Sequence, residues 1–327
     1  MLEHGGRLRQ AARRYGIPLP DWVDLSTGIN PLPYPVPPLA PEVWQRLPES
    51  DDGLEEAAAA FYGSPLLLPV AGSQAAIQAL PACFPPGRVV TLAPTYAEHP
   101  HAWRAHKLQA LPADQIDAAV AEADTLLLVQ PNNPDATCFG RARLLAWHAR
   151  LAARGGRLIV DEAFIDGDPT DSLVPLAGTP GLVVLRSVGK FFGLAGARVG
   201  FVFGEAALLE TLADRLGPWA VSGPAREVTA AALADRPWQE AARLTLADAT
   251  GRLAALLETA GLTGGGGTAL FQWRPTPAAV ALHGRLAEQG ILTRLFEATS
   301  LAPAGLRFGL PGSEAEWRRL EAALAHL

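Results

Sequence analysis

Short apolar runs between residues 66 and 204 constrain the fold of this chain more than any other feature. Two of the segments between them, SQAAIQALPACF and RARLLAWHARLAARGG, predict helices, and the second ends on a glycine pair that suits a helix C-terminus. Strands that alternate with helices indicate a mostly parallel sheet covered by helices. The runs are LLLPVAG (66–72), RVVTLAP (88–94), TLLLVQP (125–131), RLIVDEAF (157–164), GLVVLRS (181–187) and RVGFVFG (198–204).

The pattern changes after residue 205, where long Ala/Leu/Arg/Glu stretches around 224–260 and 313–326 predict helices. GTALFQWRP and ILTRLF, between those stretches, predict strands. The proline-rich segment NPLPYPVPPLAPEVW can form neither a regular helix nor a central strand. A chain of 327 residues also exceeds what one compact domain usually holds. We expect an α/β protein with an N-terminal arm (1–33) that joins the smaller domain, a large domain (34–215) and a smaller α+β domain (216–327).

Composition excludes several classes of protein. The net charge is -6 and no block of basic residues stands out, so we expect no nucleic-acid partner. The first residues lack the apolar core of a secretory signal, and no segment approaches the ~20 apolar residues of a membrane span. Cys83 and Cys138 have neither the number nor the spacing for disulfides or a metal site. We expect a cytoplasmic enzyme that acts on a small molecule and binds no metal.

Lysine is almost absent, since nearly every cation is arginine and the sequence contains only Lys107 and Lys190. A guanidinium stays protonated, whereas a lysine can lose its proton in a suitable site and act as a nucleophile. Lys107 lies in the polar stretch RAHKLQ, which is typical of a surface. Lys190 follows an apolar run and is therefore the candidate for chemistry.

Polar residues follow four of the runs, at the carboxyl ends of strands where open α/β sheets bind ligands. A Gly-Ser pair that opens a helix suits a phosphate, because free amides and the helix dipole both favour an anion. Each residue alone also fits an ordinary turn or helix cap. An anion site, a carboxylate and an amine together indicate a functional site. The residues are Gly72, Ser73 and Gln74; Asn132 and Asn133; Asp161; and Ser187 with Lys190.

PNNP, DEAF and SVGKFFGLAGARVGF occur in an order that resembles fold-type I pyridoxal-phosphate enzymes related to histidinol-phosphate aminotransferase. The resemblance implies the fold of a fold-type I transferase and pyridoxal 5'-phosphate held as a Schiff base on Lys190. It implies that Asp161 pairs with the pyridinium nitrogen and that Asn133 bonds the ring 3'-oxygen. It also assigns Tyr96 to the ring face and the cofactor phosphate to the turn at Gly72 with Ser73, Gln74, Ser187 and Arg198.

Further motifs resemble the threonine-phosphate decarboxylases of cobalamin biosynthesis. They are HGG (4–6), DLSTGINP (24–31), AGSQAAIQALP (71–81), PTYAEH (94–99), VDEAFID (160–166), VLRSVGKFFGLAGARVGF (184–201) and PWAVSG (218–223). The resemblance implies a carbon–carbon lyase that converts L-threonine O-3-phosphate to (R)-1-amino-2-propanol O-2-phosphate. Two residues differ from the aminotransferases, which usually have tyrosine at the positions of Phe164 and Leu47. The second of those tyrosines reaches the cofactor phosphate of the neighbouring subunit, a bond that leucine cannot make.

The substrate implied by this resemblance is anionic at both ends, which calls for cations that bind a carboxylate and a phosphate. Arg294 and Arg307 match the two substrate-binding arginines of the family, and the sequence does not decide which anion each one binds. The N-terminal arm is expected to close over the substrate with His4, Gly5, Gly6 and Asn30, while the role of Arg7 is open. The resemblance also implies a homodimer and allows a partner enzyme of the cobalamin pathway.

Two other functions stay open at this point. An aminotransferase of the histidinol-phosphate type shares nearly all of these motifs and would break the α-proton bond instead of the bond to the carboxylate. A non-catalytic interaction protein of the cobalamin pathway could keep the fold without turnover. The joint presence of Lys190, Asp161, Asn133 and Arg198 argues against that second alternative.

Overall fold

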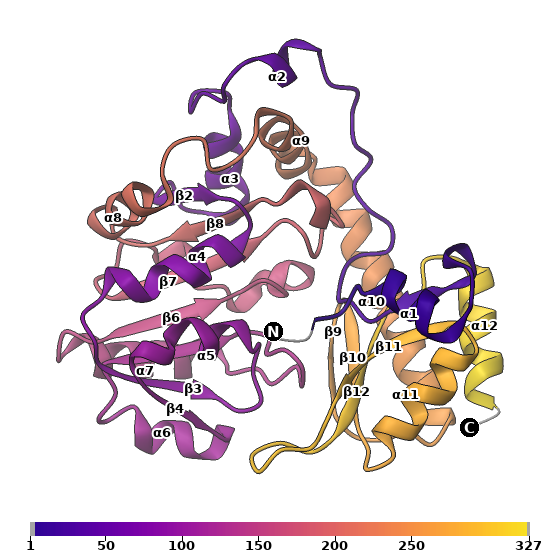
Figure 1. Ribbon diagram of the computed structural model, residues 1–327. Helices are drawn as coiled ribbons and strands as arrows, with labels where there is room; N and C mark the ends of the chain where they lie inside the picture. Colours follow the sequence, from indigo (N-terminus) through magenta and orange to yellow (C-terminus); the bar gives the residue numbers. More distant parts are fainter. Residues whose placement is uncertain (1–3, 326–327) are drawn as a thin grey trace.

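The computed structural model describes residues 4–325, and within that range the strands form two sheets (Figure 1). The larger sheet has seven strands in the order β2-β8-β7-β6-β5-β3-β4, and the smaller has five in the order β1-β11-β12-β10-β9. The four pairs from β4 to β7 are parallel, whereas β8 is antiparallel to both β7 and β2. The predicted α/β fold class, with a mostly parallel sheet and a second α+β part, is confirmed.

All six apolar runs form strands of the large sheet, and one further strand was not predicted. That strand, β4, has the sequence KLQAL and lies at an edge of the sheet, so its composition lacks the apolar signal of a central strand. The strands are β2 (Leu67–Val70), β3 (Arg88–Leu92), β4 (Lys107–Leu111), β5 (Thr125–Val129), β6 (Arg157–Asp161), β7 (Leu182–Ser187) and β8 (Gly200–Phe203).

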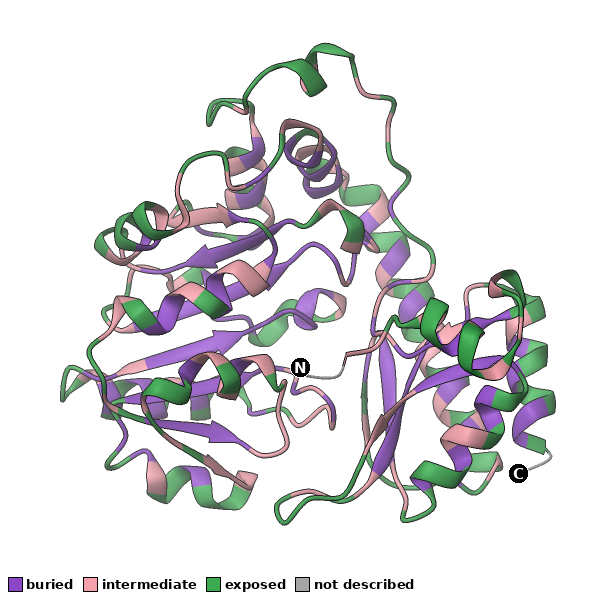
Figure 2. Ribbon diagram, viewed as in Figure 1, coloured by how far each residue is buried: buried purple, intermediate pink, exposed green. Residues whose placement is uncertain are grey.

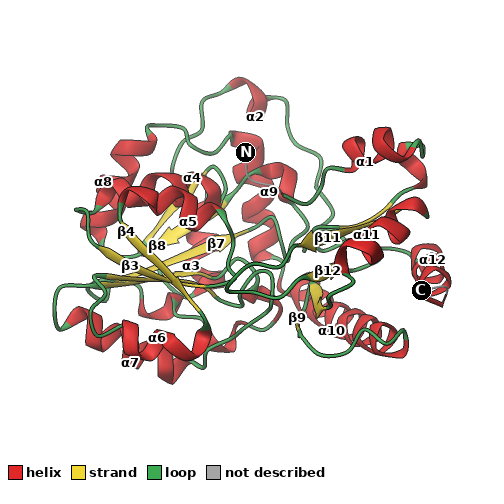
Figure 3. Cartoon of the chain, turned by 60° about the horizontal axis from the view of Figure 1, so that its bottom comes forward, coloured by secondary structure: helices red, strands yellow, loops and turns green. Residues whose placement is uncertain are grey.

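Helices cover both faces of the large sheet, which explains why its central strands are mostly apolar. In β5, Leu127 packs into the core on one face, while Leu126 and Leu128 pack into the core on the other. Figure 3 shows α4, α5 and α8 on one side of the strands and α6 and α7 on the opposite side. The helices are α3 (Leu54–Tyr62), α4 (Ser73–Ala79), α5 (Glu98–Ala102), α6 (Ile116–Ala119), α7 (Arg141–Ala152), α8 (Ala206–Leu216) and α9 (Gly223–Ala234).

The smaller sheet takes strands from both ends of the chain. Its N-terminal strand β1 (Val23–Leu25) pairs in parallel with β11, so the N-terminal segment belongs to this sheet. The predicted strand at 267–275 is divided into two antiparallel strands, β9 and β10. The other elements are α1 (Leu8–Tyr15), α10 (Arg236–Thr259), β9 (Gly266–Thr268), β10 (Phe271–Pro275), α11 (Ala279–Glu288), β11 (Ile291–Phe296), β12 (Gly305–Gly309) and α12 (Glu314–Ala325). Short 3-10 turns lie at Leu19–Asp21, Leu80–Cys83, Trp103–Ala105, Ala113–Gln115, Ile165–Gly167, Pro169–Asp171, Val174–Leu176 and Ala195–Ala197.

The proline-rich segment forms an exposed excursion that carries the short helix α2 (Glu42–Gln45), drawn mostly green in Figure 2.

Helix α9 packs against α3, and Arg226 of α9 binds Asp52 and Glu55 with distances of 2.6–2.7 Å. The proposed domain boundaries at residues 33 and 215 stay a prediction.

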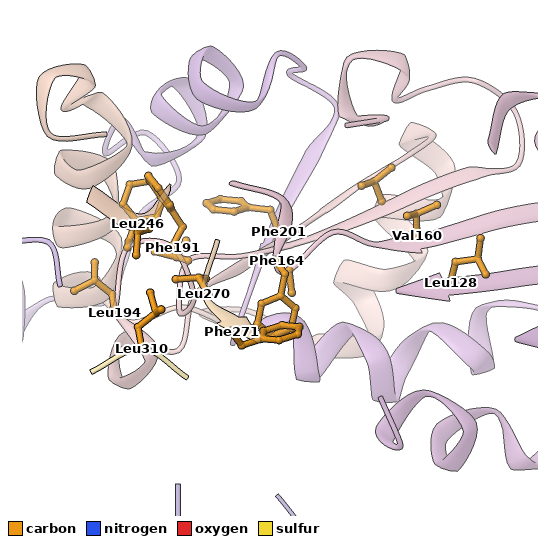
Figure 4. Close-up of a cluster of buried hydrophobic side chains, with 14 of the residues drawn as sticks. Leu128, Val160, Phe164, Phe191, Leu194, Phe201, Leu246, Leu270, Phe271 and Leu310 are labelled. Carbon is orange, nitrogen blue, oxygen red and sulfur yellow. The ribbon is translucent and has the colours of Figure 1, made fainter. Parts of the chain in front are cut away.

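The two sheets share one hydrophobic core. Phe164, which follows β6, meets Phe271 of β10 edge to face with ring centroids 5.1 Å apart. Figure 4 shows these rings beside Phe191 and Leu270 at the junction. Burial of such a side chain stabilises the fold by roughly 1.5–3 kcal/mol. This core therefore fixes the carboxyl edge of the large sheet against β10 and β12.

No helix within residues 4–325 has both the length and the apolar character that crossing a membrane requires.

Candidate active site

Lys190 lies just beyond the end of β7, at the junction between the two sheets. Its main-chain carbonyl accepts a hydrogen bond from the Asn30 amide at 3.0 Å, and its Nζ lies 5.3 Å from the centroid of the Phe164 ring. Burial and the positive charge of Arg307 lower the pKa of Lys190 to about 8, although Asp161 opposes that shift. At pH 7 roughly a tenth of this lysine is therefore a neutral, nucleophilic amine, far more than for a lysine with an ordinary pKa.

Asp161 ends β6 and is 2% exposed. Its Oδ1 accepts a hydrogen bond from the Ala163 amide at 3.0 Å, and its Oδ2 lies 2.9 Å from Nε2 of His99. His99 is itself buried, and the sequence analysis did not select it as a site residue. The available signal was its place in PTYAEH, three residues after Tyr96. The two contacts fix the orientation of a buried carboxylate close to Lys190.

Gly72 and Ser73 form a turn at the start of α4, and the Arg198 side chain packs against it. A Cβ atom on Gly72, whose φ is 72°, would lie 2.5 Å from Nη2 of Arg198, so the backbone must approach this guanidinium closely. Arg198 has a left-handed φ of 54°, a conformation that costs a non-glycine residue about 1–3 kcal/mol. Gly200, which pairs with Ser187, packs against the Ser73 amide. The turn presents an arginine and a helix N-terminus together, which suits a phosphate.

Gln74 and Tyr96 are joined by their side chains. The Tyr96 hydroxyl donates to Oε1 of Gln74 at 3.3 Å, and Nε2 of Gln74 donates to Glu98 at 2.8 Å. Both ends of the Gln74 amide are therefore engaged, which leaves its main-chain amide as its contribution to an anion site. Burial, together with the negative charges of Asp161 and Glu98, raises the pKa of Tyr96 to about 12, so this phenol is neutral at physiological pH.

Arg294 and Arg307 are directly opposed in the antiparallel pair of β11 and β12. Like charges in opposed positions are destabilising, so the arrangement favours a bound anion. Nη1 of Arg307 donates to Oδ1 of Asn133 at 2.6 Å, and Nη2 donates to the Ser26 carbonyl at 3.0 Å. Burial and the charge of Arg294 lower the pKa of Arg307 to about 10, which leaves this arginine charged at neutral pH.

A cavity of about 360 Å³ lies between the sheets and brings together predicted residues from three parts of the chain. This cavity is not lined by Gly6 or Asn30, nor by the predicted cofactor residues Gly72, Ser73, Gln74, Asp161, Ser187, Lys190 and Arg198. The Gly6 amide donates to Oγ of Ser26 at 2.7 Å, and Nδ2 of Asn30 donates to the Phe191 carbonyl at 2.9 Å. The predicted residues that line the cavity are His4, Gly5, Tyr96, Asn133, Arg294 and Arg307.

Other predicted features lie away from this cavity. Lys107 is exposed on the edge strand β4, and Leu47 is exposed near α2. Both cysteines are free, and residues 4–325 hold no group of three His, Cys, Asp or Glu side chains that could bind a metal ion.

An amine with a lowered pKa, an oriented buried carboxylate and a turn that suits a phosphate, all at one sheet edge, are what a pyridoxal-phosphate enzyme requires. The chain belongs to the aminotransferase class I and II family, whose model matches residues 39–324. Within this family it is 56% identical to the threonine-phosphate decarboxylase of Pseudomonas aeruginosa, over 99% of this chain and 97% of that protein. It is 43% identical to the threonine-phosphate decarboxylase of a Sinorhizobium species, over 100% of this chain and 98% of the relative. The resemblance expected from the motifs is confirmed.

Solved structures support the same fold. Histidinol-phosphate aminotransferase from Sinorhizobium meliloti in complex with pyridoxal-5'-phosphate superposes with a TM-score of 0.82 at 22% identity, covering 99% of this chain and 95% of the other. L-threonine-O-3-phosphate decarboxylase from Porphyromonas gingivalis gives a TM-score of 0.72 at 19% identity, covering 92% and 98% respectively.

Proposed function

We propose that this chain is a threonine-phosphate decarboxylase, which converts L-threonine O-3-phosphate to (R)-1-amino-2-propanol O-2-phosphate for cobalamin biosynthesis. The observation that carries the proposal is the cross-strand pairing of Arg294 and Arg307 at the wall of the cavity. Two adjacent guanidinium groups fit a substrate with both a carboxylate and a phosphate. The 56% identity to the Pseudomonas aeruginosa threonine-phosphate decarboxylase supports this substrate.

The cofactor is pyridoxal 5'-phosphate, and the residues present fit it. Lys190 supplies the amine, Asp161 the carboxylate for the ring nitrogen, and Asn133 a donor for the ring oxygen. In our proposal the cofactor phosphate binds the Gly72 turn, where a Cβ atom would fill the space in front of Arg198. The remaining proposed contacts are Ser73, Gln74 and Ser187 for the phosphate and Tyr96 for the ring face. When bound, the cofactor withdraws the electron pair that departing carbon dioxide leaves on the substrate α-carbon.

The chain's own groups then have distinct tasks. The buried Asp161 carboxylate, oriented by His99 and the Ala163 amide, keeps a proton on the ring nitrogen. Lys190 has a pKa of about 8, so its Nζ can both release and return a proton near neutral pH. We propose that this atom delivers the proton that replaces the lost carboxylate. The neutral Tyr96 phenol adds no charge to the site.

The geometry favours one division of labour between the arginines. Arg307 is buried and held by Asn133 and Ser26, so its fork has a fixed direction beside the proposed ring site. We assign the substrate α-carboxylate to Arg307. Arg294 lines the cavity together with His4 of the N-terminal arm. We assign the substrate phosphate to Arg294 and His4.

The proposed enzyme is a homodimer. Trp44 and Leu47 near α2 are 69% and 63% exposed, and Trp219 is 58% exposed. Large apolar side chains at such exposure are typical of surfaces that a second protein covers. The proposal also includes a cobalamin-pathway enzyme as a second partner.

The decisive experiment is incubation of the holoenzyme with phosphothreonine. We expect stoichiometric carbon dioxide and an amino-alcohol phosphate, detected by mass spectrometry. Formation of a keto acid with pyridoxamine phosphate would instead identify an aminotransferase. No conversion of phosphothreonine by holoenzyme with full cofactor content would exclude the proposed reaction.

A further inference from the structure

Glu98, the first residue of α5, uses both carboxylate oxygens to join separate parts of the chain. Its Oε1 lies 2.7 Å from Nε2 of His4 in the N-terminal arm. Its Oε2 accepts hydrogen bonds from Nε2 of Gln74 at 2.8 Å and from Nε2 of Gln78 at 3.0 Å, both in α4. The Glu98 side chain is only 13% exposed, so water competes weakly for these contacts. Glu98 lies within the motif PTYAEH, but the sequence analysis did not select it as a site residue.

The N-terminal arm has a second anchor in the segment that follows β1. The Gly6 amide donates to Oγ of Ser26 at 2.7 Å, and that hydroxyl donates to Asp24 at 2.6 Å. A Cβ atom on Gly5 would lie 2.1 Å from the Ser26 carbonyl oxygen, so only glycine allows this approach. Residues 4–6 are therefore held between the segment after β1 and Glu98 beside the large sheet. His4 and Gly5 line the cavity between these two anchors.

The chemistry of the contact fixes the state of the His4 ring. A carboxylate only accepts hydrogen bonds, so Nε2 of His4 carries a proton and Nδ1 is the nitrogen left for a ligand. Glu98 thus fixes the position of the His4 ring and the nitrogen that it offers to a ligand.

We propose that Glu98 is a positioning residue that holds His4 over the cavity for the phosphate of the substrate, an inference that rests on the proposed function. Glu98 also fixes Gln74, whose Oε1 accepts from the Tyr96 hydroxyl at 3.3 Å. The same carboxylate therefore connects the arm to the helix that begins at the proposed cofactor-phosphate turn.

The test compares steady-state kinetics of holoenzyme variants. Glu98→Ala should raise KM for phosphothreonine about 10-fold to 100-fold, the range for one lost charged hydrogen bond, with little change in kcat. KM for unphosphorylated threonine should change much less. Glu98→Gln keeps hydrogen-bonding groups without the charge, so its KM for phosphothreonine should lie between those of the unaltered enzyme and Glu98→Ala. The matched control is Glu122→Ala, which removes the carboxylate of an exposed pair with Arg88 and should leave KM unchanged.

A double-variant cycle separates positioning from general damage. If Glu98 acts through His4, Glu98→Ala combined with His4→Ala should have the same KM as His4→Ala alone. Additive losses would overturn the proposal, because Glu98 would then act by another route. A loss confined to cofactor affinity, with KM for phosphothreonine unchanged, would also overturn it.

A second readout does not depend on activity. Trypsin cleavage of the holoenzyme after Arg7 and Arg9 reports how firmly the N-terminal arm is held. Cleavage should accelerate to the same extent in Glu98→Ala and His4→Ala and stay unchanged in Glu122→Ala. Equal cleavage rates in all four proteins would exclude a role for Glu98 in holding the arm. If trypsin cleaves the variants as expected but the unaltered enzyme does not convert phosphothreonine, the proposed function is wrong while the anchoring of the arm by Glu98 stands.

Discussion

Arg307 and Asn133 connect the two sheets through a hydrogen bond of 2.6 Å from Nη1 to Oδ1. A guanidinium only donates, so this contact turns the amide oxygen of Asn133 toward Arg307 and leaves the amide NH2 group as a donor. That NH2 group suits the ring oxygen that the family resemblance assigns to Asn133. One amide thus links the proposed carboxylate-binding arginine to the proposed cofactor ring, and movement of either affects the other.

Borohydride reduction of the holoenzyme should fix the cofactor on the peptide that contains Lys190. The chain provides its own control, because Lys107 is the other lysine and lies exposed on an edge strand. Peptide mapping by mass spectrometry identifies the labelled residue. Lys190→Ala should abolish turnover, whereas Lys107→Ala should not affect it. A cofactor label on Lys107 would contradict the assignment.

The pH dependence of cofactor attachment follows from the pKa of Lys190, which is lowered from 10.5 to about 8. An amine is protonated below its pKa and neutral above it, and only the neutral form attacks an aldehyde. Attachment to cofactor-free protein should therefore accelerate as pH rises through about 8 and level off near pH 9. Rapid quenching with borohydride at each pH measures the rate. A rate that still climbs steeply at pH 10 would indicate a lysine with an ordinary pKa.

Asp161→Asn should leave the protein folded but slow decarboxylation by about 10²-fold or more, because a neutral amide cannot keep the ring nitrogen protonated. His99→Phe should have a smaller effect in the same direction, because it leaves Oδ2 of Asp161 without its 2.9 Å partner. His99→Gln can still donate to that oxygen and should recover part of the lost rate. Single-turnover kinetics measure all three, and a near-normal rate for Asp161→Asn would show that another group protonates the ring.

Much of the fold could be predicted because its signals are local. The buried strands of the large sheet are short apolar runs, and the residues that follow them converge at one edge as parallel strands require. Lys190, Asp161 and Asn133 could therefore be selected from their positions in the sequence. Strands β1 and β12 were not predicted, and in β12 the sequence GLRFG carries two glycines and an arginine, which weaken the signal of a strand.

The polar contacts between distant segments could not be predicted. Arg186 lies within an apolar run of β7, yet it is 2% exposed and binds Glu162 at 2.7 Å and also Asp166. Glu162 follows Asp161 directly, so this buried ion-pair network holds the segment beyond β6 in place. His99 and Glu98 were missed for the same reason. Their partners lie far away in sequence, at Asp161 and at His4, and only the folded chain brings them together.

Substrate choice provides the sharpest test of the two arginines. Arg307→Ala should lower kcat/KM for both phosphothreonine and threonine, with a loss of transition-state stabilisation of about 2 to 5 kcal/mol, because each substrate has an α-carboxylate that would be left unpaired. Arg294→Ala should cost a similar amount for phosphothreonine and much less for threonine, which has no phosphate. Lysine at either position keeps the charge but loses the bidentate fork, so neither lysine variant should restore full activity. Parallel kcat/KM measurements on both substrates show which arginine binds the phosphate and which binds the carboxylate. If Arg294→Ala penalises the two substrates equally, the phosphate binds elsewhere; if neither alanine variant impairs phosphothreonine turnover, the proposed substrate site is wrong.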